Sequence, residues 1–232
     1  MLLKVEKLVV GYRKKKALRG ISLDVDAGEI VGIIGHNGAG KTTLLKSLFG
    51  LLPPWNGQII FEGKNINGRS TELNVKDGLS YMPQGQGLFP DMSVRDNLDL
   101  GDYGLGKKAS KISVEEVFEL FPILKTRSKQ KAGTMSGGQQ RMLSLGITLM
   151  QNPKLLLLDE PSIGLAPIIV QNVMDTVKEI NSRLGTSIMI VEQNIEAVSN
   201  IVDRFFIIKI GAIVFSGGTD IIHDKKKLWE LF

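Results

Sequence analysis

Near-continuous apolar runs dominate the last third of the chain, and segments with a helical pattern separate them. The runs are LLLLDE, SIMIVEQ and RFFIIKIGAIVFSGG. One helical pattern extends from about Ile168 to Leu184, and another begins at about Asn194. Apolar runs of this kind are typical of parallel strands that are covered on both faces. The pattern therefore predicts an α/β fold with a mostly parallel sheet.

The first third of the chain predicts further strands. They correspond to the runs KVEKLVV, ISLDVDAG, EIVGIIG and GQIIFEGK. The stretch GKTTLLKSLFGLL lies between the last two runs and predicts a helix. We expect this helix to end before Pro53 and Pro54, because proline cannot continue a helix.

The middle of the chain predicts helices, since it carries two signals for a helix start. Ser93 is followed three residues later by Asp96, and Ser113 by Glu116. A hydroxyl and an acid at this spacing form a capping box, in which each side chain bonds the other residue's backbone amide. At the other end of the chain, a short helix is expected from Thr219, with Leu228, Trp229 and Phe232 on one side.

Composition is that of an ordinary globular protein. The 232 residues are 43% hydrophobic and 23% charged, which is enough for one sizeable core. No apolar run approaches the roughly 20 residues that a bilayer crossing needs. The first residues, MLLKVEKLVVGY, lack the features of a signal peptide, and there is no cysteine. These observations lead us to expect a cytoplasmic protein that is soluble when isolated.

The net charge of +5 allows an anionic partner. Part of the excess lies in the lysine runs 14–16 and 225–227, which we interpret as solvated faces. No basic patch interleaved with aromatic residues is present, so we expect no nucleic-acid partner.

The strongest local motif is GHNGAGKTT, residues 35–43, between a predicted strand and a predicted helix. It matches the phosphate-binding loop G-x-x-x-x-G-K-[ST] in its required setting. Backbone amides of such a loop cradle phosphates at a helix N-terminus. We expect Lys41 to supply a positive charge to the phosphates, and the Thr42 hydroxyl can ligate Mg²⁺. The predicted nucleotide-binding residues here are Gly35, His36, Asn37, Gly38, Ala39, Gly40, Lys41, Thr42 and Thr43, and His36 receives no catalytic role.

A second acidic motif follows the run LLLL. Asp159 ends a predicted buried strand. In phosphate-loop enzymes, an aspartate at the end of such a strand helps to hold Mg²⁺. Glu160 comes next, where a general base could polarise the water that attacks the γ-phosphate. The sequence therefore predicts a nucleotide hydrolase with Glu160 as its base.

The stretch MSGGQQRMLSLGITLM, residues 135–150, narrows the class. Together with the phosphate loop it resembles the signature of ABC ATPases, and the resemblance covers essentially the whole chain. The resemblance implies ATP and Mg²⁺ as cofactors, Tyr12 against adenine, and Gln84 beside the attacking water and Mg²⁺. It also implies that the signature acts in trans on the ATP of a second subunit, through Ser136, Gly137, Gly138 and Gln139.

The same resemblance implies the domain organisation. It predicts one ABC-type nucleotide-binding domain over 1–232, with a phosphate-loop core, an antiparallel β subdomain and a helical subdomain inserted at about 88–150. The chain departs from the family pattern at Met135, which replaces a commoner leucine, and at Ala166, which replaces an aspartate. The third departure is Gln193, which stands where the family has a switch histidine. Glutamine offers a donor and an acceptor but never becomes cationic.

The stretches DEPSIGLAP and VEQN are similar to the LivF-like ATPases of branched-chain amino acid uptake systems. This similarity implies a second ATPase subunit, identical or different, two integral membrane permeases and an extracytoplasmic solute-binding protein. The chain would then act peripherally at the cytoplasmic face of the membrane. The alternatives are a urea or short-amide importer, a non-transport ABC ATPase and a lipid or lipopolysaccharide extractor.

Contact with the permeases is expected after Gln84, in residues 87–90. Leu88 and Phe89 would seat a permease helix if they are exposed. The alternative is that Phe89 belongs to the core of the subdomain.

Overall fold

The computed structural model describes residues 1–85, 87–103 and 112–223. The expected tail side chains of Leu228, Trp229 and Phe232 and the lysine run 225–227 therefore lie outside the described residues. No helix within the described ranges is long and apolar enough to span a bilayer.

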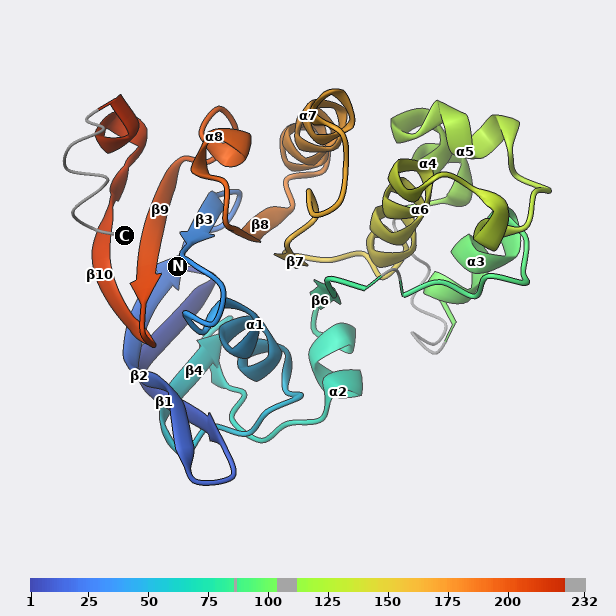
Figure 1. Cartoon of the computed structure of the whole chain (residues 1–232). Coiled ribbons are helices and arrows are strands. Elements are labelled where there is room, and N and C mark those ends of the chain that lie inside the picture. Colours follow the sequence, from blue (N-terminus) through green and yellow to red (C-terminus); the bar gives the residue numbers. More distant parts are fainter. Residues whose placement is uncertain (86, 104–111, 224–232) are drawn as a thin grey trace.

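Two sheets organise the chain (Figure 1). The larger sheet has the strand order β10-β9-β3-β8-β7-β6, and all its neighbouring strands are parallel except the β9–β10 pair. Its strands are β3 Ile30–Ile34, β6 Leu79–Met82, β7 Leu155–Asp159, β8 Ser187–Glu192, β9 Arg204–Lys209 and β10 Ala212–Gly218. The smaller sheet, in the order β2-β1-β4-β5, is antiparallel. Its strands are β1 Leu3–Tyr12, β2 Lys15–Val25, β4 Asn56–Phe61 and β5 Lys64–Asn65.

The helices occupy three places in the chain. α1 Lys41–Phe49 and α2 Thr71–Lys76 precede β6, whereas α7 Pro167–Leu184 and α8 Ile195–Val198 flank β8. A separate group lies between β6 and β7, on the side of the molecule away from the antiparallel sheet (Figure 1). It consists of α3 Val94–Gly101, α4 Val114–Leu120, α5 Pro122–Thr126, the short helix η1 Ala132–Thr134 and α6 Gly137–Leu149, and a last short helix, η2 Thr219–His223, follows β10. The α/β class, with a mostly parallel sheet, an antiparallel part and inserted helices, is confirmed.

The central strands are apolar throughout because both faces of the larger sheet are covered. In β7, Leu156 and Leu158 pack into one hydrophobic cluster, whereas Leu155 and Leu157 pack into the other. Successive side chains of a strand point to opposite faces, so a strand buried on both faces needs apolar residues at every position. Each fully buried leucine of this kind contributes about 2 kcal/mol by leaving water.

Two predicted helix starts are confirmed, and one predicted helix end is corrected. Ser93 and Ser113 both form complete capping boxes, with Asp96 and Glu116. α1 ends before Pro53, as expected, but it ends at Phe49, earlier than the predicted stretch, because Gly50 takes a left-handed conformation with φ 96° and caps the helix.

The C-terminal apolar run is divided into two strands. Ile210 and Gly211, between β9 and β10, both have positive φ, 50° and 78°. Two such residues form the tight turn that matches the twist of an antiparallel hairpin. The helix expected from Asn194 is short, and Asn194 is its cap, with a side chain that accepts a hydrogen bond from the Glu196 amide.

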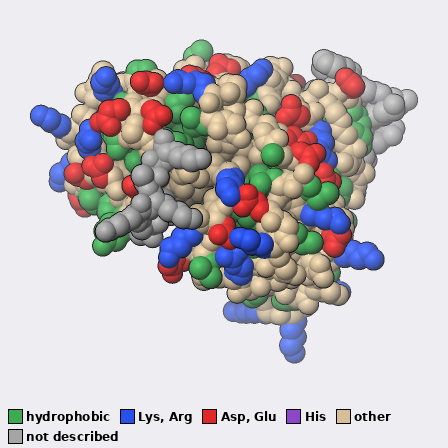
Figure 2. Space-filling model, turned by 180° about the vertical axis from the view of Figure 1, so that it is seen from behind, with side chains coloured by type: hydrophobic (Ala, Val, Ile, Leu, Met, Phe, Trp, Pro, Cys, Tyr) green, Lys and Arg blue, Asp and Glu red, His purple; other side chains and the backbone are tan. Residues whose placement is uncertain are grey.

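Acidic and basic side chains are interspersed over the face shown in Figure 2. On that face, the excess of positive charge is therefore not gathered into one large patch.

Candidate functional site

The phosphate loop joins β3 to α1, and its glycines have steric reasons to be glycine. Gly40 caps α1 with φ 113°, and it provides no side-chain hydrogen bond to the first turn. A Cβ atom on Gly35 would lie 2.3 Å from the Ile208 carbonyl oxygen. The amides of the first turn thus meet no capping side chain, and an uncapped helix N-terminus favours a bound anion.

Lys41, the first residue of α1, turns back across this loop. Its Nζ donates to the carbonyl oxygens of Gly35 at 2.8 Å and His36 at 3.2 Å. The same atom pairs with Glu160 Oε1 at 3.2 Å, and both side chains are almost fully buried. The carboxylate of Glu160 is therefore the anion that pairs with Lys41.

Asp159 is fully buried at the end of β7 and is bonded on both oxygens. Thr42 Oγ1 donates to Oδ1 at 3.0 Å, and Tyr81 Oη donates to Oδ2 at 2.9 Å. Burial raises the pKa of Asp159, and the two hydrogen bonds oppose this rise. Thr42 and Asp159 thus place a hydroxyl and a carboxylate oxygen side by side, as the oxygen preference of Mg²⁺ requires.

Tyr81 did not enter the sequence-based prediction. It is paired in register with Leu157, and residues two apart in a strand share a face. Tyr81 therefore lies on the same face as Asp159, two residues after Leu157. Burial and the neighbouring Asp159 charge raise the pKa of Tyr81 far above its ordinary value, so its hydroxyl stays a donor. The signal in the sequence was a tyrosine ring, with a polar hydroxyl, in the short strand just before Gln84.

Glu160 is the centre of the constellation. Gln84 Nε2 donates to its Oε2 at 2.9 Å, and Gln193 Nε2 donates to its Oε1 at 3.1 Å. With Lys41, these amides surround one carboxylate with donors from three parts of the chain. Glu160 also has a φ of 49°, which is uncommon for a residue with a side chain.

A pocket of about 330 Å³ joins most of these predicted residues. Its lining consists of Tyr12, Ala17, Asn37, Gly38, Gly40, Lys41, Thr42, Thr43, Gln84 and Glu160. Tyr12 is 47% exposed, and its Oη lies 3.4 Å from Thr43 Oγ1. The pocket is thus lined by an aromatic ring, the phosphate loop and a carboxylate.

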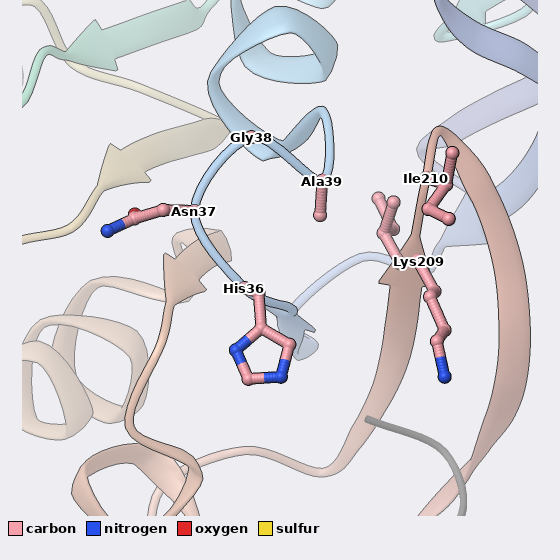
Figure 3. Close-up of a pocket in the computed structure, with 7 residues that line it drawn as sticks. His36, Asn37, Gly38, Ala39, Lys209 and Ile210 are labelled. Carbon is pink, nitrogen blue, oxygen red and sulfur yellow. The ribbon is translucent and has the colours of Figure 1, made fainter.

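Gly35 and His36 lie beside this pocket rather than in its lining. His36, with Asn37, Gly38 and Ala39, borders a second hollow of about 260 Å³, which is closed on its other side by Ile208, Lys209 and Ile210 (Figure 3). The phosphate loop therefore separates the two hollows, and Asn37 and Gly38 line both.

The signature residues are not brought to the phosphate loop within the chain. Ser136 caps α6: its Oγ accepts from the Gln139 amide at 3.4 Å, and Gln139 Oε1 accepts from the Ser136 amide at 3.1 Å. Ser136 and Gly137 are exposed, and Gly138 and Gln139 are half-buried. Their action in trans stays a prediction.

Arg141, one turn further along α6, is a second residue that the sequence-based prediction missed. Its guanidinium donates from Nη1 and Nη2 to the Gln84 carbonyl oxygen, each at 3.2 Å, and the side chain is buried. Arg141 thus ties the helix of the signature to the loop that carries Gln84.

Leu88 and Phe89 differ in their exposure to solvent. Phe89 is 56% exposed, so the alternative that it belongs to the core is wrong. Leu88 is partly buried and packs against the larger hydrophobic cluster. Contact of this segment with a permease stays a prediction.

Comparisons with known proteins agree with this geometry. The sequence pattern of the ABC transporter family matches residues 18–163. A high-affinity branched-chain amino acid transport ATP-binding protein, BraG of Pseudomonas aeruginosa, is 41% identical over 213 residues, covering 92% of this chain and 91% of that protein. A probable branched-chain amino acid transport ATP-binding protein, LivF of Archaeoglobus fulgidus, is 31% identical and covers 99% and 98%. A crystal structure of an ATP-binding cassette of an ABC transporter superposes with a TM-score of 0.87, at 29% identity, over 99% of this chain and 98% of that one.

Proposed function

This chain belongs to the ABC transporter family as an ATP-hydrolysing cassette, and on that premise we propose that it powers a membrane importer of branched-chain or related neutral amino acids. The observation that carries the solute class is the 41% identity to BraG over nearly the full length of both chains. The observation that supports hydrolysis is the carboxylate of Glu160, held in the pocket beside Lys41.

In the proposed reaction, ATP enters the 330 Å³ pocket with its adenine against Tyr12 and its phosphates on the loop. The phosphates take the place of Glu160 at Lys41. Glu160 then accepts a proton from water, whose oxygen bonds to the γ-phosphorus while the bond to the ADP oxygen breaks. A positioned base of this kind contributes about 10²–10⁴-fold to a rate.

The neighbouring side chains have supporting roles in this proposal. Gln84 and Gln193, which already bond the two oxygens of Glu160, orient the base and its water. Thr42, Asp159 and Gln84 supply the oxygen atoms that would hold Mg²⁺, which neutralises phosphate charge when bound.

The signature supplies the part of the site that the pocket lacks. We propose that Ser136, Gly137, Gly138 and Gln139 of one chain face the γ-phosphate on the loop of a second ATPase subunit. An exposed N-terminus of a 13-residue helix suits that task, since its amides attract negative charge. The second subunit is a copy of this chain or a related cassette.

The remaining assembly follows from the same proposal. Residues 1–232 form one ATPase domain, and the helical subdomain, at about 88–150, contacts two integral permeases through exposed Phe89. The complex works at the cytoplasmic face of the membrane with an extracytoplasmic solute-binding protein.

Reconstitution tests the proposal. The chain, its partner ATPase and the permeases are placed in proteoliposomes, and uptake of radiolabelled leucine, isoleucine, valine and urea is compared. ATP-dependent uptake of the three amino acids, lost in Glu160→Gln, supports the proposal. Uptake of urea alone, or ATP hydrolysis without uptake of any of these solutes, overturns the solute class.

A further inference from the structure

The carboxyl end of β8 carries a buried carboxylate that the reaction above does not use. Glu192 is 3% exposed, and it directly precedes Gln193, whose amide bonds Glu160. Its Oε1 accepts a hydrogen bond from the Ser162 amide at 2.9 Å. Ser162 lies in the turn between β7 and α7, two residues after Glu160.

This turn depends on Glu192 for a carboxylate. Residues 161–166, PSIGLA, contain no acid, so the turn cannot bond its own amides with a carboxylate. The carbonyl oxygen of Ser162 in turn accepts from the Leu165 amide at 3.2 Å. The hydrogen bond between the Ser162 amide and Glu192 therefore fixes the first part of the turn. The bond between the Leu165 amide and the Ser162 carbonyl oxygen fixes the part that leads to α7.

The same strand holds the backbone of Glu160 from both sides. The Glu160 amide donates to the Val191 carbonyl oxygen at 3.0 Å, and the Ser162 amide donates to the neighbouring Glu192 side chain. Glu160, between these bonds, is in the left-handed region with φ 49°. A residue with a side chain persists there only where its surroundings determine the conformation.

Nearby groups act on the buried carboxyl of Glu192. The positive charge of Arg141 on α6 interacts with Glu192 through space, and Glu160 is a nearby charge of the same sign. Burial raises the pKa of Glu192, and hydrogen bonds from Ser162 and the Gln193 amide oppose the rise. A buried carboxyl group with hydrogen-bond donors is tolerated where one without partners would not be.

We propose that Glu192 is a positioning residue for ATP hydrolysis: its bond to the Ser162 amide holds the backbone of Glu160 in the left-handed conformation that aims the base into the pocket. Glu192 touches neither nucleotide nor water in this arrangement. The inference concerns hydrolysis by the cassette, so it holds whichever solute the complex transports.

Two conservative variants test the proposal. Glu192→Asp keeps the charge but withdraws the oxygen from Ser162, whereas Glu192→Gln keeps the length and an acceptor oxygen but removes the charge. We measure kcat, the dissociation constant for ATP, and, in the nucleotide-free chain, amide hydrogen exchange of Ser162 by NMR. Asp203→Ala is the control, because Asp203 Oδ2 accepts a hydrogen bond from the Ile30 amide at 2.8 Å, at the start of β3 and opposite the end that carries the phosphate loop.

The expected result is a selective loss in Glu192→Asp. Its kcat falls by about ten- to hundredfold with ATP binding within about twofold of the wild type, since a small misplacement of a base affects the chemical step. Exchange of the Ser162 amide becomes about tenfold faster, because opening of the turn no longer breaks this bond. Glu192→Gln retains slow exchange and most of the activity, and Asp203→Ala leaves kcat unchanged.

Any other pattern overturns the proposal. Full activity in Glu192→Asp excludes a positioning role, and so does a loss of the same size in Glu192→Gln, which would assign the effect to charge. An equal loss of ATP binding and turnover in Glu192→Asp would make Glu192 a general structural residue. If the isolated chain hydrolyses no ATP without its partner, unchanged exchange at Ser162 alone decides against the proposal.

Discussion

The phosphate-loop edge and the signature turn both present a helix N-terminus to an anion, yet they differ in what surrounds it. At the loop, Lys41 and Glu160 are buried and paired with each other. At the signature, Ser136 and Gly137 are exposed, and the Ser136 side chain forms a capping box with Gln139.

In the proposed function, the two regions are two halves of an ATP site, and they differ in how far contacts within one chain complete them. The loop half is preorganised by groups from β6, β7 and β8, so its chemistry depends on intramolecular contacts. The signature half has an exposed helix N-terminus and small residues, and we propose that the phosphate it meets lies on the loop of a second ATPase subunit. Variants of the two halves should therefore fail in different assays.

The largest effect is expected from Glu160→Gln at the loop half. The amide keeps the size of the side chain but cannot accept a proton, so kcat should fall by about 10²–10⁴-fold. ATP binding remains, since Lys41 keeps its bonds to the loop carbonyls. Size-exclusion chromatography with ATP should then show a trapped dimer, and unchanged turnover would remove Glu160 as the base.

Lys41→Ala, also at the phosphate loop, should weaken the binding of ATP. Losing a charged hydrogen-bond donor to phosphate costs about 1.5–3 kcal/mol, which corresponds to roughly ten- to hundredfold weaker ATP binding. Isothermal titration calorimetry measures the effect, and Lys125→Ala, on exposed α5 surface, is the control. Equal affinity in the two variants would contradict the assignment.

Gly137→Val should break only the signature half. A Cβ atom on Gly137 meets nothing within 4 Å inside the chain, so the folded monomer accommodates it. We expect the monomer's ATP affinity to stay within about twofold, while hydrolysis by the dimer falls about tenfold or more, because the added bulk meets the partner's phosphate. Gly218→Val, where a Cβ also meets nothing, is the control. Loss of ATP binding by the monomer would show that the two halves are not separate.

Gln193→His should change the loop half by a smaller factor. Histidine keeps a donor for Glu160 and adds a group that titrates near pH 6.5, so single-turnover hydrolysis should rise a few-fold and acquire a new pH dependence in that range. Gln193→Ala removes the bond to Glu160 and serves as the comparison. An unchanged rate and pH profile would show that Gln193 takes no part in hydrolysis and is only a polar residue after the end of β8.

The smallest effect concerns stability against pH. Burial raises the pKa of Glu192 above 4.5, so between pH 4.5 and its folded pKa the folded state binds more protons than the unfolded state. The stability contributed by Glu192 is thus complete below pH 4.5 and is lost as pH rises through the folded pKa. Urea unfolding should show that Glu192→Gln removes this loss.

Glu116 of α4 provides the control of opposite sign. Its bonds to Ser113 lower its pKa, so its contribution is present above pH 4.5 and is lost as pH falls through the lowered value. Equal pH profiles of Glu192→Gln and the wild type would contradict the buried-carboxylate interpretation.

The sequence predicted what is local and missed what depends on strand register. The phosphate loop and the capping boxes of Ser93 and Ser113 are defined within a few residues, so spacing was sufficient. The Tyr81–Asp159 bond joins residues 78 positions apart and exists only because β6 pairs with β7 in one register. Arg141 reaches the Gln84 carbonyl across 57 positions, and no pattern in either segment indicates that contact.

The pairing of Lys41 with Glu160 has a consequence for nucleotide exchange. The carboxylate is an internal competitor for the lysine, so every ATP that binds must displace it, and the apparent affinity falls by the fraction of time that the pair is closed. The same competitor is ready to recapture Lys41 when hydrolysis has separated the γ-phosphate. Glu160 would therefore favour release of the hydrolysis products from the pocket, and it would weaken the binding of ATP.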